Sequence, residues 1–382
     1  MSQHQDGLDT QDIRETARKV ADKQIAPNAA KRDQDHTFPW DAMKALAEVG
    51  LLQVGISTAY GGMGGSRREF TLIAQEVAKA CASTALVYVT NSMVAKAIEA
   101  DGNETTKRKW LPLLLAGKSL GALAVHEPDS GCIMAAISTR ARKDGDTYVI
   151  NGSKFLVTSA GEADVYLVIA RPDPLTAPQQ MHILLVEKDI PGLAFGRVED
   201  KMGLTSTSSR QLFFNDCRVP HDHLIGQEGE GHKVLGAAVA GWGIFGAAGL
   251  AVGIAQSATE RSVRYAKERK IGGEPIALQQ AIQLMIADMV IQTDAASALL
   301  DAGAAHADAN PGKAAFHAFK AKLFSSEAAI AVTDKAIQVH GGHGYCKDYI
   351  VERLYRDARG LTLHFKTSEL LRLEIAEAIL KM

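Results

Sequence analysis

The stretch Gln338-Val339-His340-Gly341-Gly342-His343-Gly344-Tyr345 lies between two segments with helical periodicity. A Gly-Gly pair at such a break lets the backbone come unusually close to a ligand or to a neighbouring chain. The run Leu354-Tyr355-Arg356-Asp357-Ala358-Arg359 follows, and its polar groups can cap or pair at the end of a helix. Together the two runs predict helices joined by a loop that makes a close contact.

The composition is that of an ordinary globular protein. The 382 residues are 46% hydrophobic and 23% charged, which suits about two or three domains. The formal net charge of −2 gives no basic field for nucleic acid or for an anionic membrane. We expect no apolar run of the roughly 18 residues that span a bilayer, and the polar N-terminus predicts a cytoplasmic protein. The cysteines are far apart, which predicts free thiols and no metal site: Cys81, Cys132, Cys217 and Cys346.

The chain has three parts. Apolar residues recur at helical spacing at the start, short β-type runs dominate the middle, and long helical periodicity returns at the end. Successive strands without intervening helices predict an antiparallel barrel or sandwich. Glycine-rich breaks divide the last part at Gly272-Gly273, Asn310-Pro311-Gly312 and Gly341–Gly344. The predicted domains are 1–118 (helical), 119–226 (β) and 227–382 (helical).

Further motifs are Ala124-Val125-His126-Glu127-Pro128-Asp129-Ser130-Gly131, Asn151-Gly152-Ser153-Lys154-Phe155-Leu156-Val157-Thr158 and Glu268-Arg269-Lys270. With the two C-terminal runs, they resemble the acyl-CoA dehydrogenase family over nearly the whole chain. The resemblance implies an α+β fold with an N-terminal helical domain, a middle antiparallel β domain and a C-terminal four-helix bundle. It also implies FAD as cofactor, an acyl-CoA thioester as substrate, and a homo-oligomer, most often a dimer of dimers.

Several family positions in the middle domain are altered. His126 replaces a threonine that, with neighbours such as Val125, hydrogen-bonds the flavin pyrimidine. Cys132 replaces a serine that contacts the CoA arm, and Leu156 replaces an aromatic residue that lies against the isoalloxazine. Thr158 is kept from the same hairpin. His126 is therefore either a hydrogen-bond donor that tunes the flavin or a satisfied imidazole of the core.

The C-terminal part carries the remaining cofactor positions. The resemblance implies that Arg269 reaches the FAD pyrophosphate of a neighbouring subunit, and a guanidinium suits this role because it binds phosphate oxygens in a fixed fork. Further residues match positions that hold the adenine and ribitol side of FAD across the interface, or that make the last FAD contacts: Gln280, Gln338, Gly341, Gly342, Thr367 and Glu369.

The usual catalytic base is missing. The family removes a proton beside the thioester with a carboxylate from one of two positions. Here Phe365 occupies the first, and Gly243 with Ile244 occupies the second. The Gly-rich run from Gly241 to Gly246 is unusual in a helix, which predicts a kink or a cavity there.

Three explanations remain open. His364, next to the vacated position, is a candidate substitute base. Alternatively, the reduced flavin reacts with oxygen. In that case Phe365, Phe245 and Trp242 line an aromatic, water-poor pocket, and His126 donates a hydrogen bond there. The third explanation is a non-catalytic FAD-binding subunit whose partner supplies the chemistry. We expect oxygenation of the substrate as the reaction.

Overall fold

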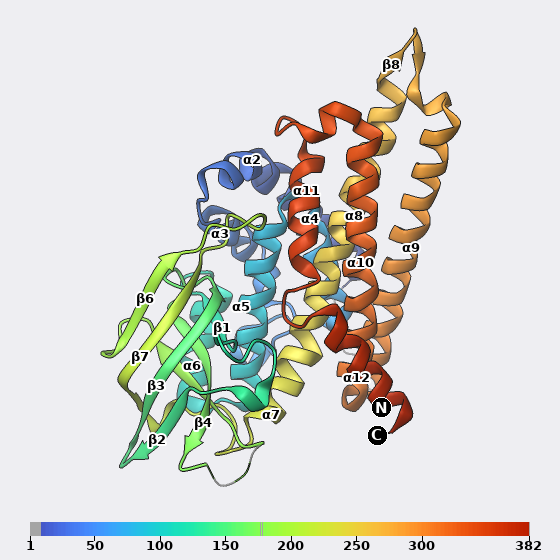
Figure 1. The fold of residues 1–382 in the computed structure, drawn as a ribbon. Helices are drawn as coiled ribbons and strands as arrows, with labels where there is room; N and C mark the ends of the chain where they lie inside the picture. Colours follow the sequence, from blue (N-terminus) through green and yellow to red (C-terminus); the bar gives the residue numbers. More distant parts are fainter. Residues whose placement is uncertain (1–8, 176, 178, 382) are drawn as a thin grey trace, which may run out of the picture.

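The computed structural model describes residues 9–175, 177 and 179–381. The N-terminal helices pack on one another and on the last helical part (Figure 1). A capping box, in which Ser66 and Glu69 bond each other's backbone, begins the buried helix α4. The helices of this part are α1 (Thr10–Val20), a π-helical turn (Ala21–Ile25), α2 (Ala26–Asp35), α3 (Trp40–Glu48), α4 (Arg67–Ala80), α5 (Ala82–Asp101) and α6 (Glu104–Leu115).

The middle part is a seven-stranded sheet in the order β1-β4-β2-β3-β7-β6, with β5 on the other side of β4. Most neighbours are antiparallel, as predicted. However, β4 pairs in parallel with both β1 and β2, which the sequence analysis did not anticipate. The strands are β1 (Gly121–Ala124), β2 (Arg140–Asp144), β3 (Thr147–Thr158), β4 (Val165–Asp173), β5 (His182–Glu187), β6 (Leu193–Val198) and β7 (Ser209–Pro220).

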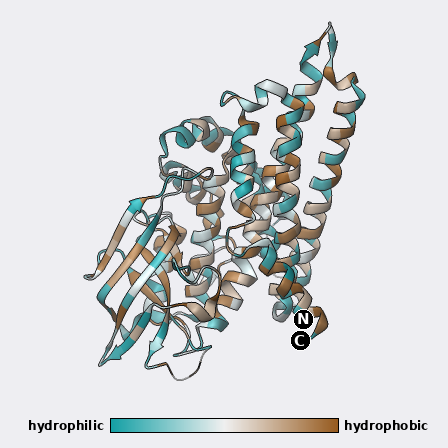
Figure 2. Ribbon diagram, in the orientation of Figure 1, coloured by the Kyte–Doolittle hydropathy of each residue, from teal (hydrophilic) through white to brown (hydrophobic). Residues whose placement is uncertain are grey.

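The last part is a bundle of long helices that ends in a small hairpin at one end (Figure 1). All three glycine-rich breaks coincide with helix ends. Figure 2 shows apolar residues recurring along the packed helices, whereas the ends of the strands are more hydrophilic. The elements are α7 (Gly231–Val234), a π-helical segment (Leu235–Gly243), α8 (Ile244–Glu268), β8 (Lys270–Ile271), β9 (Glu274–Pro275), α9 (Gln280–Ala309), α10 (Ala314–His340), α11 (Ile350–Leu361) and α12 (Ser368–Leu380).

One helical stretch corrects an expectation from the sequence. Gly231–Glu268 is long and apolar enough to cross a bilayer by length and composition, although no such run was expected. Of its most apolar window, 83% is buried inside the protein. This burial is the pattern of a core helix, whose apolar surface is covered by neighbouring helices.

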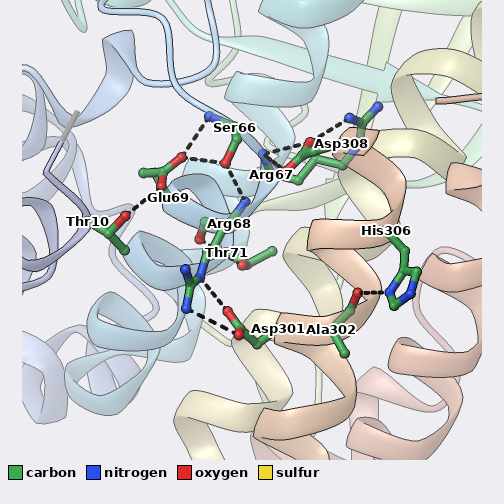
Figure 3. A network of polar contacts seen from close by, with 10 residues as sticks. All are labelled: Thr10, Ser66, Arg67, Arg68, Glu69, Thr71, Asp301, Ala302, His306 and Asp308. Atoms are coloured by element: carbon green, nitrogen blue, oxygen red, sulfur yellow. Dashed lines mark hydrogen bonds and ion pairs between the residues drawn. The ribbon is translucent and has the colours of Figure 1, made fainter. Parts of the chain in front are cut away.

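The predicted kink near Gly241 takes the form of the π-helical segment Leu235–Gly243. Such segments are rare and leave backbone groups that need other partners. Arg67 supplies one, because its Nε donates to the Gly241 carbonyl at 2.7 Å while its Nη1 pairs with Asp308 at 2.8 Å. Its guanidinium also lies 4.9 Å from the centre of the Trp242 ring. Figure 3 shows this arginine beside the neighbouring Arg68–Asp301 pair, so both link α4 to α9.

We expect Arg67→Met to lower the free energy of unfolding by about 2–3 kcal/mol, because it leaves Asp308 and the Gly241 carbonyl without their charged donor. The matched control is Arg68→Met, which breaks a pair exposed on both sides and should change stability by only about 0.2–1 kcal/mol. Urea unfolding followed by circular dichroism measures both. Equal effects of the two substitutions would contradict the role given to Arg67.

Candidate functional site

A cavity of about 360 Å³, here called the interdomain cavity, lies between the middle sheet and the C-terminal helices. The π-helical segment and α10 give it apolar walls, including Val239 and Phe319. From the middle part, the predicted residues Val125, His126 and Cys132 line it together. Phe365 and Lys366 close it from the loop before α12, and Glu374 joins them from α12 itself.

A buried ion pair fixes the backbone that carries His126. Lys154 Nζ lies 2.8 Å from the Glu127 carboxylate and donates to the Val125 carbonyl at 2.9 Å. Both side chains are almost completely buried. The same carboxylate accepts from Ser138 and from the backbone N–H of Thr139. Every oxygen of this buried group is therefore satisfied, and the backbone on both sides of His126 is held by charged partners.

His126 and Cys132 contact each other at the wall of this cavity. His126 Nε2 lies 3.5 Å from Cys132 Sγ, and the His126 carbonyl accepts from the Phe155 N–H at 2.8 Å. Burial, aided by the nearby Lys154 charge, lowers the pKa of His126. The imidazole is therefore neutral near pH 7, and one ring nitrogen is a donor and the other an acceptor.

The two positions that would carry a carboxylate base meet in space. A Cβ placed on Gly243 would lie 3.2 Å from Phe365 Cε1 and 2.5 Å from the Met93 sulfur. Phe365 adopts a positive φ of 60° and lines the cavity. Lys322 Nζ holds the loop before α12 by donating to the Lys366 carbonyl. An aromatic ring and a thioether therefore fill the space where a carboxylate would stand.

His364 does not line the interdomain cavity, although it precedes Phe365. Burial, with the charges of Lys322 and His126, lowers its pKa to about 4. It is thus a neutral side chain behind the loop. The sequence analysis missed the one carboxylate among the described residues that line this cavity, Glu374, whose Oε1 is in contact with Lys366 Nζ. No motif or spacing in the sequence of α12 distinguishes Glu374 from the other acidic residues of that helix.

Two of the three aromatic residues expected in this pocket are elsewhere. Trp242 packs edge-on against Phe70 at 5.6 Å, and Phe245 is completely buried in the helical core. Neither lines the interdomain cavity, so that part of the prediction was wrong; Phe319 lies there instead. The π-helical segment explains the error, because it changes which side chains of a helix face each neighbour.

A second cavity of about 500 Å³, here called the terminal cavity, lies where α8 and α10 end. It brings together four predicted cofactor residues: Arg269, Gln338, Gly341 and Gly342. The sequence analysis missed an aromatic cluster beside them. Tyr265 stacks on His340 at 4.2 Å between ring centres, and its hydroxyl lies 2.8 Å from His343 Nδ1. Gln279, rather than the predicted Gln280, lines this cavity.

Four other predicted contacts lie outside both cavities. Leu156 sits at an irregularity between β3 and β7, with a positive φ of 51° and 48% of its surface exposed. Thr158, two residues further on, is nearly buried. Thr367 caps α12 by accepting from the Leu370 N–H, and Glu369 is exposed in the first turn of that helix. Their roles toward a cofactor stay predictions.

The residues present fit FAD. An apolar cavity with a neutral imidazole donor suits a flavin ring, and the exposed, bulged Leu156 leaves apolar surface for a ring system to cover. At the terminal cavity, the Arg269 guanidinium has no ion-pair partner among the described residues, and Gly341 has a positive φ of 59°. A free guanidinium beside a glycine backbone is suited to phosphate oxygens.

The Glu127 carboxyl predicts a loss of stability in acid. Burial alone would raise its pKa, but Lys154 and the Ser138 and Thr139 donors outweigh burial and lower the pKa from 4.5 to about 2. A lowered carboxyl pKa stabilises the fold above the ordinary value, and this stability is lost as pH falls from about 4.5 toward 2. The double variant Glu127→Gln with Lys154→Met replaces the ion pair by neutral side chains. Between pH 6 and 3, its urea midpoint should fall less steeply than that of the unaltered protein. An unchanged slope would show that other groups dominate.

Comparison with known proteins gives a consistent result over the whole chain. The family models for the acyl-CoA dehydrogenase N-terminal, middle and C-terminal domains match residues 8–118, 122–217 and 229–380. Acryloyl-CoA reductase (NADH) of Anaerotignum propionicum is 38% identical over 97% of this chain and 94% of its own.

Two solved structures bear on the chemistry. An acyl-CoA dehydrogenase complexed with FAD from Bacillus anthracis superposes with a TM-score of 0.91 at 28% identity, covering 100% of this chain and 68% of that one. The prolyl acyl carrier protein oxidase AnaB has a TM-score of 0.91 at 27% identity, covering 97% of this chain and 98% of that one.

Proposed function

Because the chain belongs to the acyl-CoA dehydrogenase family of FAD-dependent acyl-CoA oxidoreductases, and because neither base position holds a carboxylate, we propose that it oxidises an acyl thioester with molecular oxygen as co-substrate. When bound, FAD supplies the acceptor for two electrons. The observation that carries the proposal is that Phe365 and Met93 occupy the space that a side chain at Gly243 would enter, so neither base position offers a carboxylate.

The residues of the interdomain cavity have separate roles in this proposal. Val125, Val239 and Phe319 exclude water, which protects reactive oxygen species at a flavin from side reactions. Phe365 limits the space beside the carbon next to the thioester. The neutral His126 is placed to donate a hydrogen bond at the cavity wall, and Cys132 fixes its ring from the other side.

A relative in this fold supports oxygen as the acceptor. AnaB is an oxidase that acts on a prolyl group carried by an acyl carrier protein. The same acceptor, and a carrier-protein thioester as an alternative to CoA, are therefore reasonable for this chain. Other relatives are named as dehydrogenases or reductases, so oxygen use is a proposal about this chain and its altered site.

The test is product analysis with oxygen-18 gas across a panel of aliphatic and ring-bearing acyl-CoA esters. We expect turnover that requires oxygen, with the label incorporated into the acyl product. Label found only in hydrogen peroxide would narrow the reaction to an oxidase. Undiminished turnover without oxygen, with an artificial electron acceptor present, would overturn the proposal.

A second candidate is α,β-desaturation with a substitute base. The observation in its favour is Glu374, a carboxylate that lines the interdomain cavity beside Phe365. Under this reading, Glu374→Gln abolishes anaerobic bleaching of the flavin by acyl-CoA. His364→Ala tests the other substitute base in the same assay. Bleaching that survives both substitutions removes this candidate.

The placement of the two cavities favours a shared cofactor site. Ala315 of the interdomain cavity and Gln338 of the terminal cavity lie on one helix, α10, about 35 Å apart at about 1.5 Å per residue. One FAD cannot span this distance within one chain. We therefore propose a homo-oligomer in which the terminal cavity completes the cofactor site of a neighbour. Gel filtration of the yellow protein tests this, and a monomer that keeps its flavin would contradict the shared site.

A further inference from the structure

A third and larger cavity, of about 870 Å³, adjoins the terminal cavity, because Ile337 and Tyr345 in its wall directly precede Gln338 and Cys346 in the wall of that cavity. It lies among α2, α8, α11 and the loop after β6. Figure 1 shows α2 near α11 at this end of the molecule. We call it the arginine cavity, because three arginines line it: Arg261, Arg353 and Arg356.

Arg356 accounts for two of the carboxylates in the wall. Its guanidinium binds Asp33 at 2.6 Å and Glu352 at 2.7 Å, and it also donates to the Met202 carbonyl. Asp33 in turn accepts from the Thr205 hydroxyl. Both acids therefore pair directly with Arg356, and the Asp33 charge also acts on Arg353.

The other two arginines form no direct ion pair with a described carboxylate, although the charges of Asp33 and Asp357 act on Arg353. Arg353 is only 8% exposed and lines the cavity, yet it makes no ion pair or hydrogen bond through its side chain with any described residue. Arg261 bonds only Ser257, through Nε at 3.2 Å. Burial and the nearby charges of Arg353 and Arg264 lower the pKa of Arg261, while more weakly acting acidic charges raise it. A buried cation without a partner is costly, and two neighbouring ones call for an anion between them.

Other features of the cavity wall also favour an anion. Lys201 and Lys347 add two cations, whereas Asp200 and Asp348 are the two remaining carboxylates. The first turn of α11 borders the cavity, and no side chain caps its N-terminus. The free N–H groups and the dipole at a helix N-terminus favour an anion. Tyr345, 86% exposed, and Tyr355 offer aromatic surface at the rim.

We propose that the arginine cavity binds a phosphate-bearing anion, with Arg261 and Arg353 as the main ligands and with room for a nucleotide. Two guanidinium forks present planar pairs of N–H donors, which match phosphate oxygens better than they match a single carboxylate. Neither Arg261 nor Arg353 lines the terminal cavity, in which Arg269 is the arginine predicted to contact the FAD pyrophosphate.

The experiment uses the purified FAD-loaded enzyme, so that the cofactor's own phosphates are already in place. Calorimetric titrations with inorganic pyrophosphate and with ADP are run at constant ionic strength. We expect one molecule bound per chain without release of flavin absorbance. Tighter binding of ADP than of pyrophosphate identifies a nucleotide, and equal binding identifies the anion alone.

Matched variants assign the site. Arg261→Gln should weaken pyrophosphate binding at least tenfold, because it removes a charged guanidinium fork from the cavity. The control is Arg264→Gln. Arg264 is exposed, lies about one turn further along α8 and is outside the cavity, so this substitution should change binding less than twofold. Arg353→Gln gives a second test if it folds. No binding, equal effects of the Arg261 and Arg264 substitutions, or release of FAD by the anion would each overturn the proposal.

Discussion

Replacing Phe365 by glutamate is expected to speed anaerobic reduction of the flavin by acyl-CoA roughly 10²–10⁴-fold, the usual contribution of a positioned base. The side chain at 365 already lines the interdomain cavity. Stopped-flow bleaching of the flavin at 450 nm, a wavelength at which oxidised flavins absorb, measures the rate.

Phe365→Gln is the matched control, because it has the same shape as glutamate but cannot accept the proton. If both variants bleach at the same slow rate, the substrate carbon does not lie beside position 365, and the idea of a vacated base would fail. A glutamate placed instead at Gly243 should be inactive, because its Cβ alone would meet the Met93 sulfur at 2.5 Å.

The second large effect concerns the ion pair behind His126. Lys154→Met should lower the free energy of unfolding by about 3–5 kcal/mol, because it leaves the buried Glu127 carboxylate without its cation. The loss should extend to function. The same ammonium holds the Val125 carbonyl, so the turn that carries Val125 and His126 would relax, and purified protein should retain less FAD if this turn contacts the flavin as predicted.

Chemical unfolding and flavin content measure the two consequences of Lys154→Met separately. Lys109→Met is the control, since its pair with Glu187 is partly exposed on both sides and should contribute about 1 kcal/mol or less. The combined variant Glu127→Leu with Lys154→Met should recover much of the stability but not the flavin content. A stable single variant would show that the Glu127 carboxylate finds other partners.

Much of the fold followed from local sequence patterns. Helical periodicity, glycine breaks and short β runs depend on residues close together in the chain, and the helices end where Gly272 and Gly341 predicted. The parallel pairing of β1 with β4 did not follow from them. Gly121 pairs with Val165, and no local pattern records a contact over that separation.

The candidate site likewise contains residues that the sequence could predict and residues that it could not. Val125, His126 and Cys132 come together because they share one turn, and the space beside Gly243 is bordered by Phe365, the residue at the other base position. Trp242 was misplaced because a π-helical segment alters the face of each residue, and sequence periodicity does not report this change. Glu374 was missed because only the packing of α12 brings it to the cavity.

The length of α10 has a consequence for genetics and assembly. If the helix supplies one end to its own cavity and the other to a neighbour's, two damaged chains can repair each other. A chain altered at Arg269 and a chain altered at His126, each inactive alone, would regain some activity when co-expressed, since mixed particles contain one intact composite centre. Dilution that separates the subunits would likewise strip the yellow colour from both.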